Sequence, residues 1–407
     1  MPLKQLEIWK LKLEKVVNQN FLLVSTYKIA YLFLLCFITL VVLIGCSPNQ
    51  AQTPCVPNLQ QKQGLVQLFP IEQNGKWGYI DINGRVIIRP QFKQAYGFFE
   101  KLAFVQDKEL WGFIDQTGKF SIEPEFDEVR PFSEQRAAIK KNNLWGFINK
   151  TGRFIIEPKF DEVHDFSEQR AAVKSQKKWG FLDAEGQFVV EPQFVNAGDF
   201  SEQRAAVQMN NYKTGFIDTT GKVVIEPQYS ESTNFKSGLA GVKIRKSSFW
   251  GLGEKTSFWG FINRNGKQVI PLKFDFASAF SECLADVEIS SKYGYVDVHG
   301  KIAISPQFDL VAPFTEGKAA VRIDDLWGFI NYKGEWFKEL QFNQVKSFSE
   351  GLAAVKVGEK WGYIDGKGKV VIVPQFDQTY GFHKGLAKVK QGAKWGYINE
   401  TGKYVWP

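Results

Sequence analysis

The residue types that most often carry chemistry are sparse in this sequence, and their spacing does not assemble a reaction centre. Three histidines, His164, His299 and His383, fall at three different phases of a repeated pattern, so repetition does not align them as metal ligands. No cysteine pair has metal-binding spacing, no glycine-rich loop precedes a helix, and no serine or cysteine has the context of a nucleophile elbow. We therefore expect no enzyme, no metal site and no cofactor.

A glutamate in the motif Phe-Ser-Glu, or a close variant of it, returns at regular spacing. A ladder of carboxylates could bind cations or act in pairs, but catalysis normally needs one asymmetric group of residues. We therefore favour a structural role, in which each carboxylate caps a turn or pairs with a basic neighbour such as Arg136 or Arg170. The recurring glutamates are Glu100, Glu134, Glu168, Glu202, Glu282, Glu316 and Glu350.

An irregular stretch at residues 245–256 is the first candidate for a partner-binding surface, because it places two aromatic side chains outside any repeated position. An exposed tryptophan among cations is typical of binding hot spots for proteins or glycans. The alternative is a tolerated partial duplication of residues 258–260 (Phe-Trp-Gly). The candidate contact residues are Arg245, Lys246, Phe249, Trp250 and, as a weaker candidate outside this stretch, Trp336.

The first 45 residues have the composition of an export signal. Lysines dominate residues 1–28, and an apolar run follows over residues 29–45. Basic residues stay cytoplasmic while an apolar segment enters the bilayer, so the remaining chain is expected outside the cytoplasm. Residues 43–46 (Leu-Ile-Gly-Cys) resemble the lipobox of bacterial lipoprotein signal peptides, which implies cleavage before Cys46 and lipidation of its thiol. The alternative is a single uncleaved membrane anchor.

Residues 46–62 are polar and indicate a flexible tether between this signal and the rest of the chain. Only Cys55 and Cys283 would remain unlipidated in the mature chain, so we expect no disulfide framework. The first 45 residues carry +3 of the net charge of +8, and the remaining +5 is spread along the repeats without a block of lysine or arginine, which argues against nucleic acid as a partner.

A repeat of about 34 residues organises residues 63–407. Each module contains Trp-Gly, an apolar stretch and then Asp or Asn followed three residues later by Gly. A fixed period of this size is the signature of a repeat architecture. We expect the tryptophans to pack in the core, with Thr214 and Tyr293 replacing two of them. The repeated tryptophans are Trp77, Trp111, Trp145, Trp179, Trp259, Trp327, Trp361 and Trp395.

Each module predicts a three-stranded antiparallel meander. Around Trp145, residues 144–149 form one strand, an Asx-x-x-Gly turn follows, and residues 154–157 form the next strand, which should end at Pro158. The aromatic-rich segment after this proline is expected to be a loop or short helical turn, and residues 137–140 form the third strand. A single module buries too little apolar area to fold alone, so neighbours must stack.

From about Leu65 to Pro407 the chain resembles the bacterial WG-repeat (KWG-repeat) proteins, because ten Trp-Gly-type modules follow in register. The resemblance implies a β-rich repeat scaffold and no established catalytic residues. We predict an all-β array, first as an open curved solenoid. The alternative is two five-module, propeller-like halves separated at residues 245–256.

The predicted function is a non-catalytic, lipid-anchored scaffold that binds another protein of the cell envelope. The alternative is a glycan-binding or peptidoglycan-binding repeat protein, which would need tryptophan or tyrosine rings on exposed faces.

Overall fold

The computed structural model describes residues 67–245 and 257–407, which all belong to one compact unit spanning Cys55–Pro407. Every regular element in these two ranges is a β-strand. No helix in them is long and apolar enough to span a membrane. The predicted signal, tether and anchor, together with the 246–256 part of the irregular stretch, lie outside the described residues.

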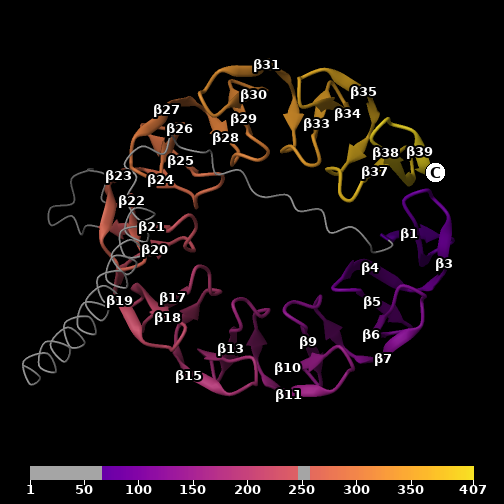
Figure 1. The fold of residues 1–407 in the computed structure, drawn as a ribbon, viewed down its shortest axis with the longest axis horizontal. Coiled ribbons are helices and arrows are strands. Elements are labelled where there is room, and N and C mark those ends of the chain that lie inside the picture. Colours follow the sequence, from indigo (N-terminus) through magenta and orange to yellow (C-terminus); the bar gives the residue numbers. More distant parts are fainter. Residues whose placement is uncertain (1–66, 246–256) are drawn as a thin grey trace, which may run out of the picture. The chain divides into compact units, whose positions relative to one another are not determined.

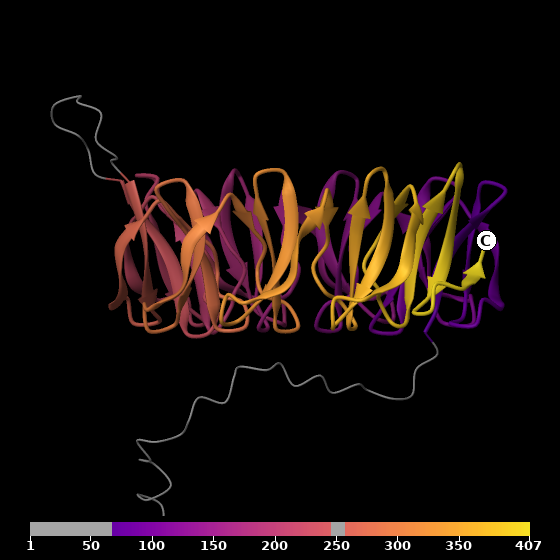
Figure 2. The same cartoon turned by 90° about the horizontal axis from the view of Figure 1, so that it is seen from above.

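The described strands form ten antiparallel sheets that stand side by side in a closed ring (Figure 1). Seen from the side, the strands run between the two faces of the ring (Figure 2). This arrangement is a ten-bladed β-propeller. The expected open solenoid was wrong, because the last sheet packs against the first. The propeller-like architecture of the alternative is confirmed, but its division into two five-module halves was wrong, because all ten modules lie in one ring.

Each sheet has the same order from the centre of the ring outward, and the first sheet has only the last three of four positions. The innermost strands are β4 (Gln94–Phe99), β8 (Glu128–Val129), β12 (Glu162–Val163), β16 (Asn196–Ala197), β20 (Glu231–Ser232), β24 (Phe276–Ala277), β28 (Leu310–Val311), β32 (Gln344–Val345) and β36 (Gln378–Thr379). The second strands are β1 (Phe69–Gln73), β5 (Leu102–Asp107), β9 (Arg136–Lys141), β13 (Ala171–Ser175), β17 (Arg204–Gln208), β21 (Leu239–Arg245), β25 (Leu284–Ile289), β29 (Lys318–Ile323), β33 (Leu352–Val357) and β37 (Leu386–Gln391).

The third strands carry the repeated Trp-Gly motif, and the fourth strands form the outside of the ring (Figure 1). The third strands are β2 (Lys76–Ile80), β6 (Leu110–Ile114), β10 (Leu144–Asn149), β14 (Lys178–Leu182), β18 (Thr214–Asp218), β22 (Ser257–Asn263), β26 (Lys292–Asp297), β30 (Leu326–Asn331), β34 (Lys360–Asp365) and β38 (Lys394–Asn399). The outer strands are β3 (Val86–Phe92), β7 (Phe120–Phe126), β11 (Phe154–Phe160), β15 (Phe188–Phe194), β19 (Val223–Tyr229), β23 (Gln268–Phe274), β27 (Ile302–Phe308), β31 (Trp336–Phe342), β35 (Val370–Phe376) and β39 (Tyr404–Trp406).

The three predicted strands of each module are present, but two details differ from the prediction. The aromatic-rich segment contributes a short innermost strand instead of a loop or helical turn, so most sheets have four strands. The outer strand β11 continues through Pro158, whereas we predicted its end there. Because β11 is an edge strand, the missing N–H of Pro158 interrupts no ladder on its free side.

The glycine after each tryptophan is required by a bulge between the third and outer strands. Trp145 pairs with Phe160, and two residues later Phe147 pairs with Ile156, so the outer strand carries extra residues at this point. A Cβ atom on Gly146 would lie 2.5 Å from the carbonyl oxygen of Ile156. The expected close approach at this glycine is therefore made by the backbone of its own sheet.

The predicted Asx-x-x-Gly turn joins these two strands. The Oδ1 atom of Asn149 accepts hydrogen bonds from the backbone N–H groups of Thr151 and Arg153, at 3.0 and 3.1 Å. Gly152 has a φ of 81°, which favours glycine over residues with a Cβ. The same turn recurs around the ring and fixes the hairpin register.

The apolar core lies between neighbouring sheets and is repeated around the ring. Phe166, on the segment before β13, packs edge-on against Phe147 of the preceding sheet, with ring centroids 5.0 Å apart. Ile156 of that preceding sheet joins the same buried cluster as Val173 and Leu182 of the next. Each sheet therefore buries its faces only against its neighbours, as expected for modules that cannot fold alone.

Candidate functional site

The seam is the interface at which the last sheet (β36–β39) meets the first sheet (β1–β3) and closes the ring. The two sheets exchange no strand. The ring of Phe69 packs on the ring of Tyr397 with centroids 5.7 Å apart, and the Tyr397 hydroxyl donates a hydrogen bond of 3.0 Å to the carbonyl oxygen of Pro70, as the hydroxyls of Tyr79, Tyr295 and Tyr363 do to carbonyl oxygens of their own next sheets. Burial raises the pKa of Tyr397, so this hydroxyl stays protonated and available as a donor.

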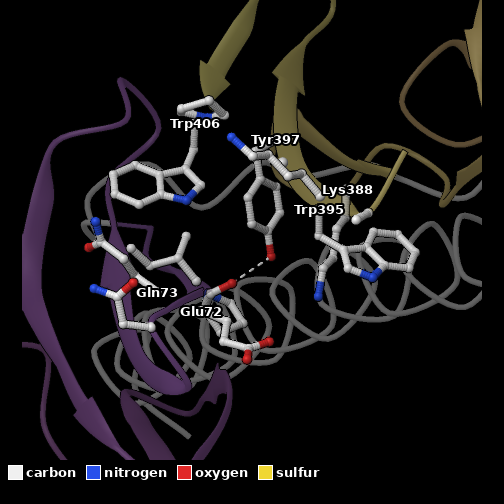
Figure 3. Close-up of a pocket in the computed structure, with 13 residues that line it drawn as sticks. Glu72, Gln73, Lys388, Trp395, Tyr397 and Trp406 are labelled. Carbon is white, nitrogen blue, oxygen red and sulfur yellow. Dashed lines mark hydrogen bonds between the residues drawn. The ribbon is translucent and has the colours of Figure 1, made fainter. Parts of the chain in front are cut away.

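A cleft of about 510 Å³ opens at the seam, and we call it the seam cleft. One wall is formed by residues 70–74 of β1 and its turn, and the other by residues of β37 to β39 and the C-terminal residue (Figure 3). Its principal side chains are Glu72, Gln73, Lys388, Trp395, Tyr397 and Trp406.

In every other sheet the second strand pairs with an innermost strand. Among the described residues, the first sheet has no such strand beside β1, so the inner edge of β1 is unpaired. In the fourth sheet, for example, the His164 N–H donates to the carbonyl oxygen of Ala172. Glu72 of β1 pairs with Trp77, and Lys174 of β13 pairs with Trp179. Pro70 and Ala172 each lie two residues before these paired residues, so they occupy corresponding positions. Pro70 has no N–H, and its carbonyl oxygen already accepts the Tyr397 hydroxyl. The edge is therefore poorly suited to strand addition, and recognition in this cleft must use side chains.

Lys388 provides the cleft with a half-buried positive charge. Its Nζ atom lies 5.2 Å from the ring centroid of Trp77 across the seam and 5.1 Å from that of Trp395. It forms no salt bridge with another described residue. Burial lowers the pKa of Lys388, and the nearby Glu72 carboxylate partly offsets this effect. A partly desolvated ammonium beside aromatic rings is suited to binding a carboxylate.

Two departures from the repeat mark this cleft in the sequence, although sequence reasoning did not single them out. Lys388 stands where alanine is usual, and Glu72 stands where lysine is usual. The corresponding alanines are Ala138, Ala172, Ala206, Ala320 and Ala354. The corresponding lysines are Lys140, Lys174, Lys243, Lys356 and Lys390. A comparison of modules position by position would have revealed both.

The structure does not bring the residues predicted to bind a partner into one site. Arg245 is exposed at the end of β21, while Lys246, Phe249, Trp250 and Cys46 lie outside the described residues. Trp336 begins β31, two sheets further along the ring. Its ring is 43% exposed and packs edge-on against Phe308 of the preceding sheet. Phe154 occupies the corresponding position and packs on Phe126 in the same way, so Trp336 belongs to the regular pattern.

The repeated tryptophans lie on the third strands of their sheets, and among the described residues all of them except Trp111 and Trp327 carry a lysine or arginine over the ring. Trp145, Trp179, Trp259 and Trp361 are buried, and Trp77, Trp111, Trp327 and Trp395 are half-buried. Lys140 lies 5.7 Å from the ring of Trp145 and also pairs with Glu128 at 2.7 Å. Lys140, Lys174 and Lys243 therefore already have carboxylate partners within the fold, whereas Lys388, which lies over Trp77 and Trp395, has none among the described residues.

The recurring glutamates link each sheet to the next, and we call this set the glutamate belt. Glu134 illustrates the arrangement, because its two carboxylate oxygens accept the backbone N–H groups of Glu168 and Gln169 at 2.9 and 2.8 Å. Both donor residues have positive φ values, 52° and 62°, in a tight two-residue turn. The other links join Glu100 to Gln135, Glu168 to Glu202 and Gln203, Glu202 to Gly238, Glu282 to Glu316 and Gly317, Glu316 to Glu350 and Gly351, and Glu350 to Lys384 and Gly385.

The glutamate belt therefore has the structural role that we favoured, with backbone amides of the next sheet as its main partners. Burial alone would raise the pKa of Glu100, but hydrogen bonds from Lys150 and from the Gln135 N–H hold that pKa below its usual value. Among the described residues, Ser237 and Lys384 replace the glutamate and leave two breaks in the belt. One break lies between the sixth and seventh sheets and the other at the seam.

Two further observations bear on chemistry. Within residues 67–245 and 257–407, no group of His, Cys, Asp or Glu side chains could hold a metal ion. Cys283, in the turn before β25, is disulfide-bonded, and its partner lies outside the described residues. The cysteine count had led us to expect no disulfide framework, and the disulfide at Cys283 was not anticipated.

The fold and the repeated motif define a β-propeller whose blades are built on Trp-Gly modules. The family described as WG containing repeat matches nine times, and the chain belongs to this family. The matched residues are 77–111, 111–145, 145–179, 179–212, 215–246, 259–293, 293–327, 327–361 and 361–395. The resemblance noted from the sequence is thus confirmed. No curated protein matches the chain in sequence.

Several solved structures are similar to this chain at low identity. PorZ of Porphyromonas gingivalis, described as a bacterial surface component of the type-IX secretion system, is 10% identical with a TM-score of 0.27. The match covers 77% of this chain and 51% of PorZ, so the chain spans about half of that protein. BamB from Moraxella catarrhalis is 11% identical over 66% of this chain and 92% of its own, with a TM-score of 0.35.

A third similar structure is the extracellular domain of the putative hybrid two-component system BT3049 from B. thetaiotaomicron. It is 11% identical over 82% of this chain and 61% of its own, with a TM-score of 0.24.

Proposed function

We propose that this chain is a non-catalytic scaffold of the cell envelope that binds another protein through the seam cleft. The observation that carries the proposal is Lys388, a half-buried lysine without an ion pair among the described residues, where alanine is usual in the repeat. A buried charge costs free energy unless a partner compensates it, so its retention favours an anionic partner group.

The other walls of the cleft narrow the chemistry of the partner. Trp395 and Trp406 offer aromatic surface, and aromatic residues dominate the hot spots of protein interfaces. Pro70 disfavours pairing of a foreign strand with β1. The occupant is therefore a protein segment that presents a carboxylate to Lys388 and an apolar or aromatic side chain to the tryptophans.

The envelope location and the anchor belong to the same proposal and rest on the sequence. The basic and apolar N-terminal segments support a location of the ring outside the cytoplasm, and the proposed attachment is through lipidated Cys46 or a single membrane anchor. The partner is then an envelope protein within reach of the tether.

Site-specific photocrosslinking in the full chain, in intact cells, tests this proposal. A photoreactive residue is placed at Gln73, which is exposed and lines the cleft. The matched control places it at Val357, the exposed counterpart of Gln73 in the ninth sheet. We expect one discrete adduct from position 73 and none of the same mass from position 357. Lys388→Met, which retains the length of the side chain and removes its charge, should abolish the adduct.

Three outcomes would contradict the proposal. The first is the same set of adducts from both positions, and the second is an adduct that persists in Lys388→Met. The third is an adduct that depends instead on residues 246–256, which would move the binding site to that irregular stretch. A thermal unfolding curve of Lys388→Met separates loss of binding from loss of the fold. If Lys388 binds the partner, the variant should lose the adduct at an unchanged unfolding temperature. If Lys388 only stabilises the seam, the unfolding temperature should fall.

A further inference from the structure

The fifth sheet (β16–β19) contains a cavity where the repeat loses its tryptophan. Thr214 occupies the tryptophan position and pairs with Gln208 on β17 and Tyr229 on β19. The cavity has a volume of about 350 Å³ and is lined by residues of β16 to β18, of β20 and the turn after it, and of β22. We call it the blade-five cavity.

A second replacement enlarges this space instead of filling it. In the fourth sheet the ring of His164 lies 4.7 Å from Trp179 and covers it. Gly198 stands at the corresponding position of the fifth sheet, because its N–H makes the equivalent hydrogen bond to the carbonyl oxygen of Ala206. Loss of a buried tryptophan typically costs about 3–5 kcal/mol when the surroundings do not collapse onto the space. In the fifth sheet Gly198 has no side chain to replace the covering ring of His164. The space left by the missing tryptophan therefore stays open.

The lining of the blade-five cavity is mainly polar, and its one charged residue, Glu231, is paired with Lys243. Several of its polar side chains lack hydrogen-bond partners among the described residues. The side chains of Thr214, Ser232 and Asn234 have no hydrogen-bond partner among the described residues. The Asn234 Oδ1 atom lies beside Gly198, 3.5 Å from the point where a Cβ would stand. Trp259 of the next sheet contributes an indole ring to the wall.

The charged groups near the cavity are already compensated. Glu231 lines the cavity, and its carboxylate pairs with Lys243 at 2.7 Å. The same lysine lies 5.8 Å from the ring of Trp259. No cation is therefore left to bind a phosphate group, and no cluster of metal ligands exists among the described residues.

We propose that the blade-five cavity binds one unit of a neutral saccharide. Hydroxyl and amide side chains supply both donors and acceptors, as the hydroxyl groups of a sugar require. Trp259 is buried but lines the cavity, and its indole gives the apolar face of a pyranose an apolar contact there. The volume lies within the range of about 300–1,000 Å³ that is usual for small-molecule sites. This site is independent of the seam cleft and of the protein partner proposed there.

Ligand-observed NMR on the purified full chain tests the inference with defined neutral probes, namely glucose, galactose, N-acetylglucosamine and their β-1,4-linked disaccharides. Thr214→Trp restores the residue of the other modules and fills the cavity. It should retain the fold and weaken binding at least tenfold. Asn234→Ala removes one polar group without filling the space and should weaken binding by about tenfold. The matched control is Tyr293→Trp, which restores the same repeat residue in the seventh sheet and should leave binding unchanged.

The inference fails if none of these sugars binds the unmodified chain in a saturable way. It also fails if Thr214→Trp and Asn234→Ala both bind as tightly as the unmodified chain, or if Tyr293→Trp weakens binding as much as they do. Because the seam photocrosslink requires none of these residues, its result is separate from this one.

Discussion

Glu282 is a member of the glutamate belt that accepts three hydrogen bonds from the next sheet, and its replacement tests whether the belt holds the sheets together. Its carboxylate accepts the backbone N–H groups of Glu316 and Gly317 at 2.8 and 3.0 Å and the hydroxyl of Tyr332 at 2.7 Å. All three donors belong to the next sheet, so Glu282 joins the seventh sheet to the eighth. In Glu282→Gln the carboxamide retains one acceptor oxygen but points an NH₂ group at one of the donors.

The size of the effect follows from the number of bonds and from their exposure. A hydrogen bond to a charged acceptor contributes about 1.5–3 kcal/mol when its partner is buried. Glu282 and both backbone donors are only half-buried, so water replaces part of the lost interaction. We therefore expect Glu282→Gln to lower the free energy of unfolding by about 2 kcal/mol. Tyr332→Phe, which removes a single donor, should lower it by about 1 kcal/mol.

Guanidinium denaturation followed by tryptophan fluorescence measures these differences as shifts of the midpoint at constant slope. The control is Glu359→Gln, because Glu359 is almost fully exposed and has only a surface pair with Lys356. This variant should lie within about 0.5 kcal/mol of the unmodified chain. The interpretation of the belt is refuted if Glu282→Gln is no less stable than Glu359→Gln. It is also refuted if the effects of Glu282→Gln and Tyr332→Phe simply add in the double variant.

Two further predictions concern the sheets themselves. Gly146→Ala should lower the free energy of unfolding by about 3 kcal/mol or more, because its Cβ would meet the Ile156 carbonyl oxygen. Gly97→Ala, with no atom within 4 Å of its Cβ, should stay within about 1 kcal/mol in the same denaturation assay, and equal losses would contradict the bulge argument. Burial raises the pKa of Asp286, so this carboxyl group favours folding when protonated and opposes it once pH rises through the folded-state pKa. Asp286→Asn should therefore be more stable than the unmodified chain at pH 7 and lose this advantage near pH 3 in thermal unfolding, whereas an advantage independent of pH would contradict the assignment.

Features that depend on neighbours in the sequence were predictable. The Asx-x-x-Gly turn was predicted because the Asn149 side chain and the positive φ of Gly152 act within five residues. The short innermost strands were missed because a two-residue strand such as β12 has no periodicity of its own. It exists only through pairing with β13, which follows it after a turn. The end predicted at Pro158 was wrong because the edge position of β11 is a property of the whole sheet.

The closure of the ring could not be predicted from any one module. Whether ten stacked sheets close or spiral depends on a small rotation at each interface, and this rotation is set by the packing of side chains between sheets. The ring closes through the contact between Phe69 and Tyr397, and these two residues lie at opposite ends of the repeat array. The recurrence of the glutamates indicated a role in turns. Their partners could not be named, because the backbone amides of the next turn approach only when adjacent sheets stack.

The two proposed binding sites follow from one property of this fold. A position that is filled alike in most modules has a structural role, as the glycine after the tryptophan has within its own sheet and the glutamate belt has between neighbouring sheets. A module that departs from the pattern must either repack or leave a space. At the seam, Lys388 replaces alanine and introduces a charge with no ion partner among the described residues. In the fifth sheet, Thr214 and Gly198 together leave a polar space. Repacking would have favoured an apolar residue at each of these positions, so binding explains the departures better than packing does.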